Sequence, residues 1–259
     1  MNTEKVITNI RNEIKKYFQK YKLKYAIFGK SEGLDSSVIA GLLSCIPEIK
    51  PIAAIIPIES NPKTEEIAKI VLSHYQIPYV LIDLTEEFKT ITEKYKSLNE
   101  QLKAIVKLDN EKIALGNIKA RLRMITLYHI AKLSGGIVIS SDNFSEYNLG
   151  FWTLNGDVGD LAPIQQIFKG TELYEIAKAL GVPKESLDAV PTDGLNINGT
   201  DKDQLFLDYP ELDENIISFI KTGVCDTRIA NIIKKTEYKR HWPKVITREE
   251  IGLKSIYEL

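Results

Sequence analysis

Two carboxylates, Asp35 and Glu146, are the residues of this chain best suited to hold a metal ion. Asp35 lies in a glycine-containing loop, and Glu146 ends the polar run SSDNFSE at 140–146, which directly follows an apolar segment. If parallel neighbouring strands precede these two segments, both carboxylates reach the same edge of the sheet. Hard oxygen ligands at that edge suit Mg²⁺ bridging the phosphates of a nucleotide. The alternative for each residue taken alone is that it caps a helix.

The loop around Asp35 predicts a phosphate site. Its sequence GKSEGLDS, at 29–36, separates the apolar run at 26–28 from a helical pattern that continues to Leu43. Backbone N–H groups in such a loop bind phosphate together with the positive end of the helix dipole. The loop lacks both the Gly-Lys-Ser/Thr ending of a P-loop and the G-x-G-x-x-G pattern of dinucleotide-binding loops. We therefore expect a phosphate site of another type.

Two cations, Lys169 and Arg121, are candidates to bind phosphate or carboxylate groups. The alternative is that Lys169 is solvated on the surface and that the stem of Arg121 lies along its own helix. The three histidines, His74, His129 and His241, lack the spacing of metal ligands, which favours structural roles for them.

The apolar pattern predicts the elements that position these residues. Short apolar runs alternate with helical patterns, which is typical of an α/β fold with a central parallel sheet and right-handed crossovers. Expected strands occupy 24–28, 52–56, 79–82 and 137–139. Expected helices occupy 3–20, 60–75, 116–133 and 171–180, and a polar helix with a mobile connection occupies 85–108. The segments at 140–170 and 191–215 have loop composition, and the second is a candidate lid.

Composition narrows the class of protein. The chain has 259 residues, 44% apolar and 27% charged, with a net charge of −1, which argues against a nucleic-acid partner. Its two cysteines, Cys45 and Cys225, are too few for a disulfide framework or a zinc site. The start of the chain lacks an apolar signal core and no run is long enough to cross a membrane, so we expect a cytoplasmic protein without a membrane partner.

Several sequence blocks occur in a fixed order along the chain. They are SEGLDS at 31–36, GNIKARLRM at 116–124, GFWT at 150–153 with Gly156-Asp157, DLAP at 160–163, Pro191-Thr192 and EYKR at 237–240. Together these blocks resemble the ammonia-dependent NAD⁺ synthetases of the N-type ATP pyrophosphatase superfamily. The likeness covers most of the chain. It implies one domain over 1–259, a three-layer sandwich in which helices flank the central parallel sheet. This is the Rossmann-like architecture called adenine nucleotide alpha hydrolase-like.

The resemblance also implies a reaction. The nicotinate carboxylate of deamido-NAD⁺ attacks the α-phosphorus of ATP, pyrophosphate leaves, and ammonia then displaces AMP from the acyl adenylate to give NAD⁺. Such an enzyme uses ATP and Mg²⁺ and forms a homodimer with substrate lying across the interface. We expect free ammonia, or ammonia from a separate partner, because the chain has no room for a glutamine-hydrolysing domain and neither cysteine lies in a nucleophile motif.

The resemblance assigns roles residue by residue. It places pyrophosphate or nucleotide against Gly29, Ser31, Gly33 and Ser36, and Mg²⁺ on Asp35 and Glu146. It places ATP against Ser141, Lys169 and Thr192, and the dinucleotide substrate against Arg121, Asp160 and Lys239. It makes Asp35 and Lys169 the catalytic residues.

Four departures from the family pattern stand out. Glu32 replaces the first glycine of the loop, Leu154 stands where the family often has a substrate-binding lysine, and Tyr238 replaces a common histidine. One residue is missing between Gly156 and Asp160. A carboxylate about 4 Å from a phosphate charge costs roughly 4 kcal/mol at an effective dielectric near 20. Glutamate also adopts positive φ less readily than glycine, so Glu32 is expected to impair the loop.

Three alternatives stay open. The first is amidation of nicotinate mononucleotide or another carboxylate by the same chemistry, since three of the four departures fall among substrate contacts. The second is a tRNA-modifying adenylase, against which the near-neutral charge and the missing Cys-x-x-Cys pair argue. The third is a non-catalytic nucleotide-binding protein whose phosphate loop has degenerated.

Overall fold

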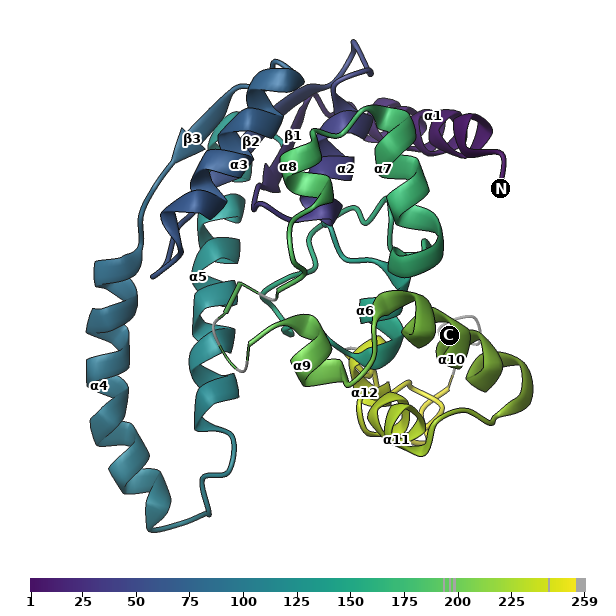
Figure 1. The fold of residues 1–259 in the computed structure, drawn as a ribbon. Coiled ribbons are helices and arrows are strands. Elements are labelled where there is room, and N and C mark those ends of the chain that lie inside the picture. The colour runs from purple at the N-terminus through teal and green to yellow at the C-terminus, as the bar shows by residue number, and fades with distance from the viewer. Residues whose placement is uncertain (193, 196, 198, 242, 255–259) are drawn as a thin grey trace.

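The sheet at the centre of the molecule is parallel throughout. The computed structural model describes residues 1–254 apart from 193, 196, 198 and 242. Four strands lie in the order β3-β2-β1-β4 (Figure 1), and every pair is parallel. The strands are β1 (Tyr25–Gly29), β2 (Lys50–Ile55), β3 (Tyr79–Leu81) and β4 (Ile137–Val138). The expected central parallel sheet is therefore confirmed.

Helices cover both faces of this sheet. Alternate residues of β1 point to opposite faces, so Phe28 joins one apolar cluster and Ile27 joins another. The first cluster receives buried side chains from α1 (Thr3–Tyr21), α2 (Leu34–Leu43), α3 (Pro62–His74) and α7 (Tyr174–Leu180). The second receives Met124, Leu127 and Ala131 of α5 (Glu111–Ser134). The two clusters make the three layers that the sequence predicts.

Local signals fix the ends of these helices. The Asn61 side chain accepts a hydrogen bond from the backbone of Lys63, and Pro62 takes the first helical position, so α3 begins as expected. Gly135 and Gly181 end α5 and α7 in the left-handed conformation that glycine favours. The helix expected at 116–133 begins earlier, at Glu111, and the one expected at 171–180 begins with a π-helical turn (Lys169–Leu173).

The segments predicted as loops contain further short helices. The first segment holds α6 (Phe144–Leu149), and the second holds α9 (Asp201–Leu205) and the start of α10 (Tyr209–Thr222). Helix α8 (Lys184–Leu187) lies between the two segments, and α11 (Thr227–Lys235) and α12 (Glu237–Arg240) follow α10. Residues of α6, α9, α10 and α11 share a third apolar cluster, which lies beside the sheet layers (Figure 1). The candidate lid at 191–215 thus contains two helical segments, and its positions 193, 196 and 198 lie outside the described residues.

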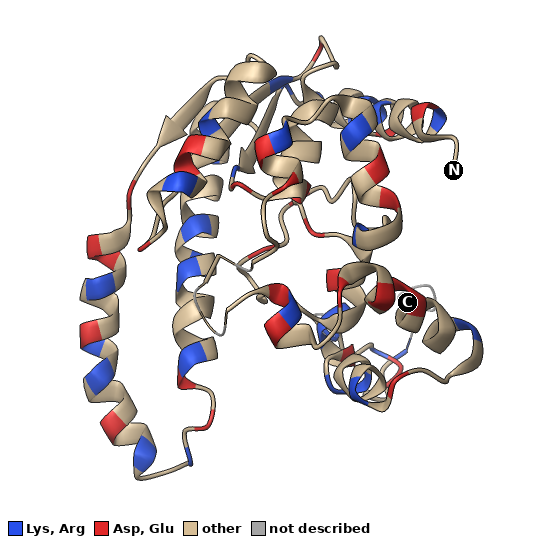
Figure 2. Ribbon diagram, viewed as in Figure 1, with Lys and Arg blue, Asp and Glu red and all other residues tan. Residues whose placement is uncertain are grey.

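Helix α4 (Thr85–Lys103) packs weakly on the rest of the chain. Phe88 is its only buried residue, and acidic and basic side chains alternate along it (Figure 2). Three pairs three residues apart join Glu86–Lys89, Glu93–Lys96 and Glu100–Lys103. Exposed pairs of this kind each contribute only a few tenths of a kcal/mol. With α5 it forms a hairpin that projects from the sheet (Figure 1).

The strand order reverses its direction at β1. The chain leaves β1 toward β2 on one side, while β4 pairs with the other side of β1. Ligands of open α/β sheets bind where the order reverses in this way, outside the carboxyl ends of the strands. The loops that follow β1 and β4 therefore meet at the position that such sheets use for binding. Among the described residues, no helix combines the length and the apolar character needed to cross a membrane.

Candidate active site

The loop between β1 and α2 is organised by its two serines. Ser31 Oγ accepts a hydrogen bond from the Gly33 N–H at 3.1 Å and lies 3.3 Å from Ser36 Oγ. Gly33 is the N-cap residue of α2, and no side chain caps the N–H groups of the first turn. These N–H groups stay available for an anion, and the dipole of the ten-residue helix favours negative charge there.

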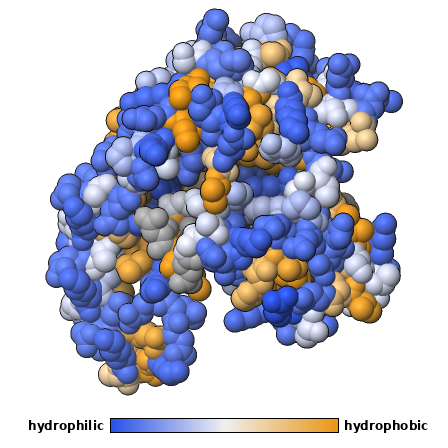
Figure 3. All heavy atoms as spheres, viewed as in Figure 1, coloured by the Kyte–Doolittle hydropathy of each residue, from blue (hydrophilic) through white to orange (hydrophobic). Residues whose placement is uncertain are grey.

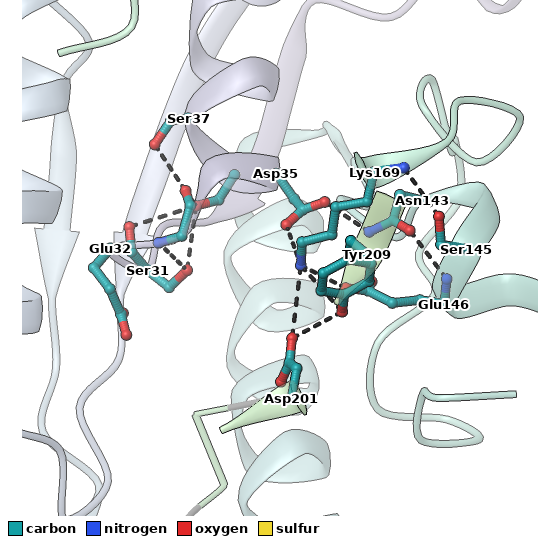
Figure 4. A network of polar contacts seen from close by, with 12 residues as sticks. Ser31, Glu32, Asp35, Ser37, Asn143, Ser145, Glu146, Lys169, Asp201 and Tyr209 are labelled. Atoms are coloured by element: carbon teal, nitrogen blue, oxygen red, sulfur yellow. Dashed lines mark hydrogen bonds and ion pairs between the residues drawn. The ribbon is translucent and has the colours of Figure 1, made fainter. Parts of the chain in front are cut away.

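Glu32 does not strain this loop. Its φ lies outside the positive range, and its carbonyl accepts a hydrogen bond from Ser186 Oγ at 2.7 Å. In Figure 4 its side chain extends away from Asp35 and Lys169. The expected conformational penalty for a glutamate at this position is therefore wrong, because the backbone here does not need a glycine. The negative charge of Glu32 would still repel a phosphate bound in this loop unless a nearby cation offsets it.

Lys169 joins the two carboxylates. Its Nζ lies 3.0 Å from Asp35 Oδ2 and 2.8 Å from Glu146 Oε1, with 9% of the side chain exposed. Asp201 Oδ2 is 3.8 Å away, and the Tyr209 hydroxyl lies 3.4 Å away (Figure 4). The structure thus brings three residues with large sequence separation to one point beyond β1 and β4. This arrangement contradicts the alternative that Lys169 is a solvated surface residue.

Neither carboxylate caps a helix. Gly33 holds the N-cap position of α2, and Asn143 holds that of α6, where its Oδ1 accepts a hydrogen bond from the Glu146 N–H at 3.0 Å. Asn143 also donates its Nδ2 to Asp35 Oδ1 at 2.8 Å, so one fully buried amide binds the carboxylate of Asp35 and the backbone of Glu146. The sequence analysis missed Asn143. Its position three residues before Glu146, at a helix start, was the available signal.

The charges in this cluster do not balance. Burial acts to lower the pKa of Lys169, but Asp35 and Glu146 hold that pKa well above its ordinary value. Burial raises the pKa of Glu146 to about 7, against the opposing effect of Lys169. Three carboxylates surround a single ammonium group, with Asp201 as the third. This excess of negative charge favours a second cation at the site.

The donor set fits Mg²⁺ held jointly by protein and nucleotide. Within the described ranges, no group of three or more His, Cys, Asp or Glu residues is placed to hold a metal by itself. Mg²⁺ usually takes one or two carboxylates from the protein and completes its shell with water and substrate phosphates. Asp35 and Glu146, which share one cation next to the phosphate loop, supply such a pair.

Asp213 fixes the backbone that carries Lys169. This fully buried carboxylate accepts hydrogen bonds from the N–H groups of Gly170 and Thr171, both at 2.9 Å, and from Ser145 Oγ at 2.5 Å. Ser145 Oγ in turn accepts a hydrogen bond from the Lys169 N–H at 3.0 Å. The sequence analysis did not single out Asp213. It lies next to Leu212 on the apolar face of α10, and a carboxylate there needs buried partners.

Asp213→Ala is expected to lower the free energy of unfolding by about 3 kcal/mol, because buried donors on Gly170, Thr171 and Ser145 lose a charged acceptor. The Michaelis constant for ATP should rise as well, since Lys169 loses its support. Urea unfolding and steady-state kinetics measure the two effects. The exposed Asp188 provides the matched control, and Asp188→Ala should change stability by less than about 0.5 kcal/mol. A loss below about 1 kcal/mol in Asp213→Ala would contradict this role.

The residues expected to bind the dinucleotide lie apart from the Lys169 cluster. Arg121 donates to the Leu154 carbonyl at 3.2 Å. Asp160 accepts from the Tyr128 hydroxyl at 3.1 Å and from the Val138 N–H at 2.9 Å.

Lys239 binds backbone rather than another charge. Its Nζ donates to the carbonyl of Gly150 at 2.7 Å and also to that of Trp152. Gly150 has φ +62°, and a Cβ there would collide with Thr236, so a glycine is required for this approach.

Three predicted nucleotide contacts form no hydrogen bond or ion pair with the Lys169 cluster among the described residues. Gly29 ends β1, and Ser141 follows β4 closely in the loop that leads to α6. Thr192 is exposed and lies next to position 193, which is outside the described residues. The structure therefore collects the phosphate-loop residues, Asp35, Glu146 and Lys169 into one site. It leaves the other predicted contacts around that site without joining them to it.

Comparison with known proteins decides the family. The sequence profile described as NAD synthase matches residues 6–247. The chain belongs to the NAD synthase family. This confirms the resemblance drawn from the motif blocks and makes the chain a member of a family of ligases.

Similar proteins and solved structures cover nearly the whole chain. The NH₃-dependent NAD⁺ synthetase of Finegoldia magna is 35% identical over 94% of this chain and 96% of its own length. That of Methanocaldococcus jannaschii is 32% identical over 93% of this chain and 95% of its own length. Among solved structures, NMN synthetase from Francisella tularensis has a TM-score of 0.81 at 25% identity, covering 93% of this chain and 96% of that one. NH₃-dependent NAD synthetase from Campylobacter jejuni has a TM-score of 0.74 at 21% identity, covering 95% and 100%. These structures confirm the expected Rossmann-like α/β fold.

Proposed function

We propose that this chain catalyses the ATP-dependent amidation of deamido-NAD⁺ with ammonia, giving NAD⁺, AMP and pyrophosphate. The observation that carries the proposal is the position of Lys169, whose ammonium group meets Asp35 and Glu146 beside an uncapped phosphate loop. Curated relatives that cover nearly the same length carry the name NH₃-dependent NAD⁺ synthetase, which supports this activity. Retention of all three charged residues argues against a non-catalytic nucleotide-binding protein. Membership of the NAD synthase family argues against a tRNA-modifying adenylase.

The chemistry requires a better leaving group on the nicotinate carboxylate. A carboxylate oxygen attacks the α-phosphorus of ATP. The bond between this phosphorus and the oxygen that bridges it to the β-phosphorus breaks, and pyrophosphate departs with that oxygen. Ammonia then attacks the acyl carbon, and AMP leaves with the oxygen that formed the anhydride. The protein contributes alignment of the reactants and stabilisation of the charge that develops on the phosphate oxygens.

Each residue of the site has a part in these steps. Ser31, Gly33 and Ser36, with the N–H groups of the first turn of α2, hold the pyrophosphate portion of ATP. Lys169 binds phosphate oxygens and stabilises their charge during adenylation. Asp35 and Glu146 would hold Mg²⁺, which would supply Lewis-acid stabilisation of the phosphates. To bind the triphosphate, the Lys169 ammonium would exchange its contacts with these carboxylates for contacts with phosphate oxygens.

The outer residues complete the substrate site in this proposal. Ser141 and Thr192 contact ATP at the rim, and Gly29 lets the nucleotide approach the end of β1. Arg121, Asp160 and Lys239 contact the dinucleotide. Since these three side chains already bind backbone or Tyr128, substrate binding exchanges some of these hydrogen bonds.

We also propose a homodimer that covers β3 and the α4–α5 hairpin. The edge strand β3 exposes Tyr79, Val80 and Leu81, each by more than 40%, and exposed apolar side chains continue onto the hairpin. Ile105 and Val106, which connect α4 to α5, are 76% and 51% exposed, and Figure 3 shows apolar atoms at the far end of the hairpin. A free strand edge with apolar side chains is a ready pairing surface. Sedimentation velocity should give twice the chain mass of 29.3 kDa, and a monomer at micromolar concentration would contradict the proposal.

The remaining expectations stay predictions of the sequence. They are a single domain over residues 1–259, free ammonia or a separate protein as the nitrogen source, no nucleic-acid partner and a cytoplasmic location. This chain and the NAD synthetases match over nearly the full length of both, which supports the single domain.

A second substrate, nicotinate mononucleotide, is favoured by one comparison. The NMN synthetase of Francisella tularensis has a higher TM-score to this chain than the Campylobacter jejuni NAD synthetase. Leu154 and Tyr238 replace common substrate-contacting residues of the family. Both substrates share the nicotinate carboxylate, so the adenylation chemistry is the same.

The test supplies deamido-NAD⁺ and nicotinate mononucleotide in parallel, each with ATP, Mg²⁺ and ammonia, and measures AMP release. We expect a higher kcat/KM for deamido-NAD⁺. A higher kcat/KM for nicotinate mononucleotide would instead assign amidation of the mononucleotide to this chain. ATP binding without turnover of either substrate would show that the chain is a nucleotide-binding protein without this activity.

A further inference from the structure

Lys30 is a buried cation inside the phosphate loop. It directly follows β1, its N–H donates to the Ala54 carbonyl at 2.9 Å, and only 3% of the residue is exposed. Its Nζ donates to Ser36 Oγ at 3.1 Å and also contacts the Ser31 carbonyl oxygen. The mechanism proposed above makes no use of Lys30, although this ammonium lies within one hydrogen bond of both loop serines.

The ammonium group of Lys30 lacks a close counterion in the part of the chain that the structure describes, where no acidic side chain forms an ion pair with it. Burial lowers its pKa to about 7, while the more distant charges of Glu32 and Asp35 act to raise it. A buried charge is costly without a close counterion, and an anion bound in the loop would supply one.

The contact with Ser36 fixes the direction of a hydrogen bond. The protonated amine of Lys30 only donates, so in that state it occupies a lone pair of Ser36 Oγ. The Ser36 hydroxyl proton then goes to another acceptor, which in this structure is the Gly33 carbonyl oxygen at 3.2 Å, and a bound phosphate oxygen would replace that carbonyl. Phosphate oxygens accept hydrogen bonds, and the nearby Ser31 Oγ and the first turn of α2 face the same loop interior.

Glu32 makes a further cation in this loop necessary. The loop of this chain carries a carboxylate where the family pattern has a glycine, and that carboxylate repels a bound phosphate. Lys30 lies two residues away and interacts electrostatically with Glu32. The pair therefore adds no net charge to the loop, while the ammonium group is the member that contacts the loop serines.

We propose that Lys30 is a positioning residue for the pyrophosphate of ATP, which offsets the charge of Glu32 and orients the Ser36 hydroxyl toward phosphate. The inference rests on the proposed function, because it takes the loop to hold the pyrophosphate portion of ATP. It adds to that function a cation that the family motif does not contain. It also explains how a glutamate is accommodated in this loop.

A double-mutant cycle tests the inference by binding alone. Isothermal titration with pyrophosphate and Mg²⁺ compares the unmodified chain with Lys30→Met, Glu32→Gly and the double variant. Lys30→Met should weaken binding at least about tenfold, the effect expected for a lost charge-assisted contact. Glu32→Gly alone should strengthen binding, and in the glycine background the loss from Lys30→Met should be several-fold smaller. Lys24→Met removes an exposed lysine just before β1 and should leave affinity unchanged.

Two results would overturn the inference. The first is pyrophosphate affinity in Lys30→Met within about twofold of the unmodified chain, and the second is an equal loss in both backgrounds. Circular dichroism and thermal unfolding of each variant separate a binding effect from misfolding, and methionine at this buried position should fold. Failure of the unmodified chain to bind pyrophosphate or ATP would instead contradict the proposed function, so the two failures are distinguishable.

Discussion

Lys169→Met is expected to lower kcat/KM for amide formation by about 10²- to 10³-fold, because the proposed function assigns its ammonium group to the charge that develops on the phosphate oxygens. The same change leaves Asp35, Glu146 and Asp201 without their shared ammonium group. Breaking a buried ion pair by removing one partner costs about 3–5 kcal/mol. The variant should therefore also lose stability at alkaline pH. Steady-state assays and urea unfolding measure the two effects.

The loss of stability in Lys169→Met should depend on pH. Glu146 has a folded-state pKa raised to about 7, and removal of Lys169 takes away an influence that lowers it. A carboxyl group with a raised folded-state pKa destabilises the fold above that pKa and ceases to do so as it binds a proton. The variant should thus be least stable near pH 8 and should recover as the pH falls from about 7 toward 5.

The control for this prediction is Lys178→Met on α7, where the ammonium group of the lysine lies over the ring of Tyr174 at the surface. Its stability should change by less than about 0.5 kcal/mol at either pH. Equal stability of Lys169→Met at pH 5 and pH 8, or activity within tenfold of the unmodified chain, would contradict the assigned role of Lys169.

Glu146→Gln should raise the Mg²⁺ concentration needed for half-maximal rate at least about tenfold and lower kcat/KM by about 10²-fold. Loss of a metal ligand costs at least as much as loss of a supporting group around the metal. Glutamine preserves the shape of the side chain and can still accept from Lys169 and from the Tyr209 hydroxyl, which lies 3.2 Å from Glu146 Oε1. The changes in Mg²⁺ requirement and kcat/KM therefore measure the loss of the negative charge of Glu146.

Calorimetric titration with MgATP in the absence of the other substrates gives a second measure for Glu146→Gln. Affinity should fall in the presence of Mg²⁺ and change little for ATP with EDTA. Glu175→Gln, an exposed position on α7, is the matched control. An unchanged Mg²⁺ requirement in Glu146→Gln would remove this residue from the metal site.

The sheet and its site followed from short-range patterns. Apolar runs indicated the strands, Asn61 indicated the start of α3, and glycines indicated the ends of α5 and α7. These local features were predicted correctly. The meeting of Asp35 and Glu146 followed from placing each after a parallel strand. Neither inference needed to know which side chains pack together.

What the sequence analysis missed depends on contacts between distant segments. Asn143 and Asp213 are polar residues whose partners lie on other elements, so their type alone does not reveal their roles. The short helices in the predicted lid are a different case. Thr200 with Asp203 and Asp208 with Glu211 form capping boxes, which were readable signals of helix starts. Glu32 was expected to strain the loop because the family pattern has a glycine at this position. That expectation was wrong, since the φ of Glu32 lies outside the positive range.

The central claim is that the nicotinate carboxylate becomes an adenylate. It is tested most directly with deamido-NAD⁺ labelled with ¹⁸O in that carboxylate, incubated with ATP, Mg²⁺, ammonia and the enzyme. Attack on the α-phosphorus predicts one ¹⁸O atom in AMP and none in pyrophosphate, with AMP and NAD⁺ formed in equal amounts. ADP and labelled inorganic phosphate, or AMP without the label, would contradict the account.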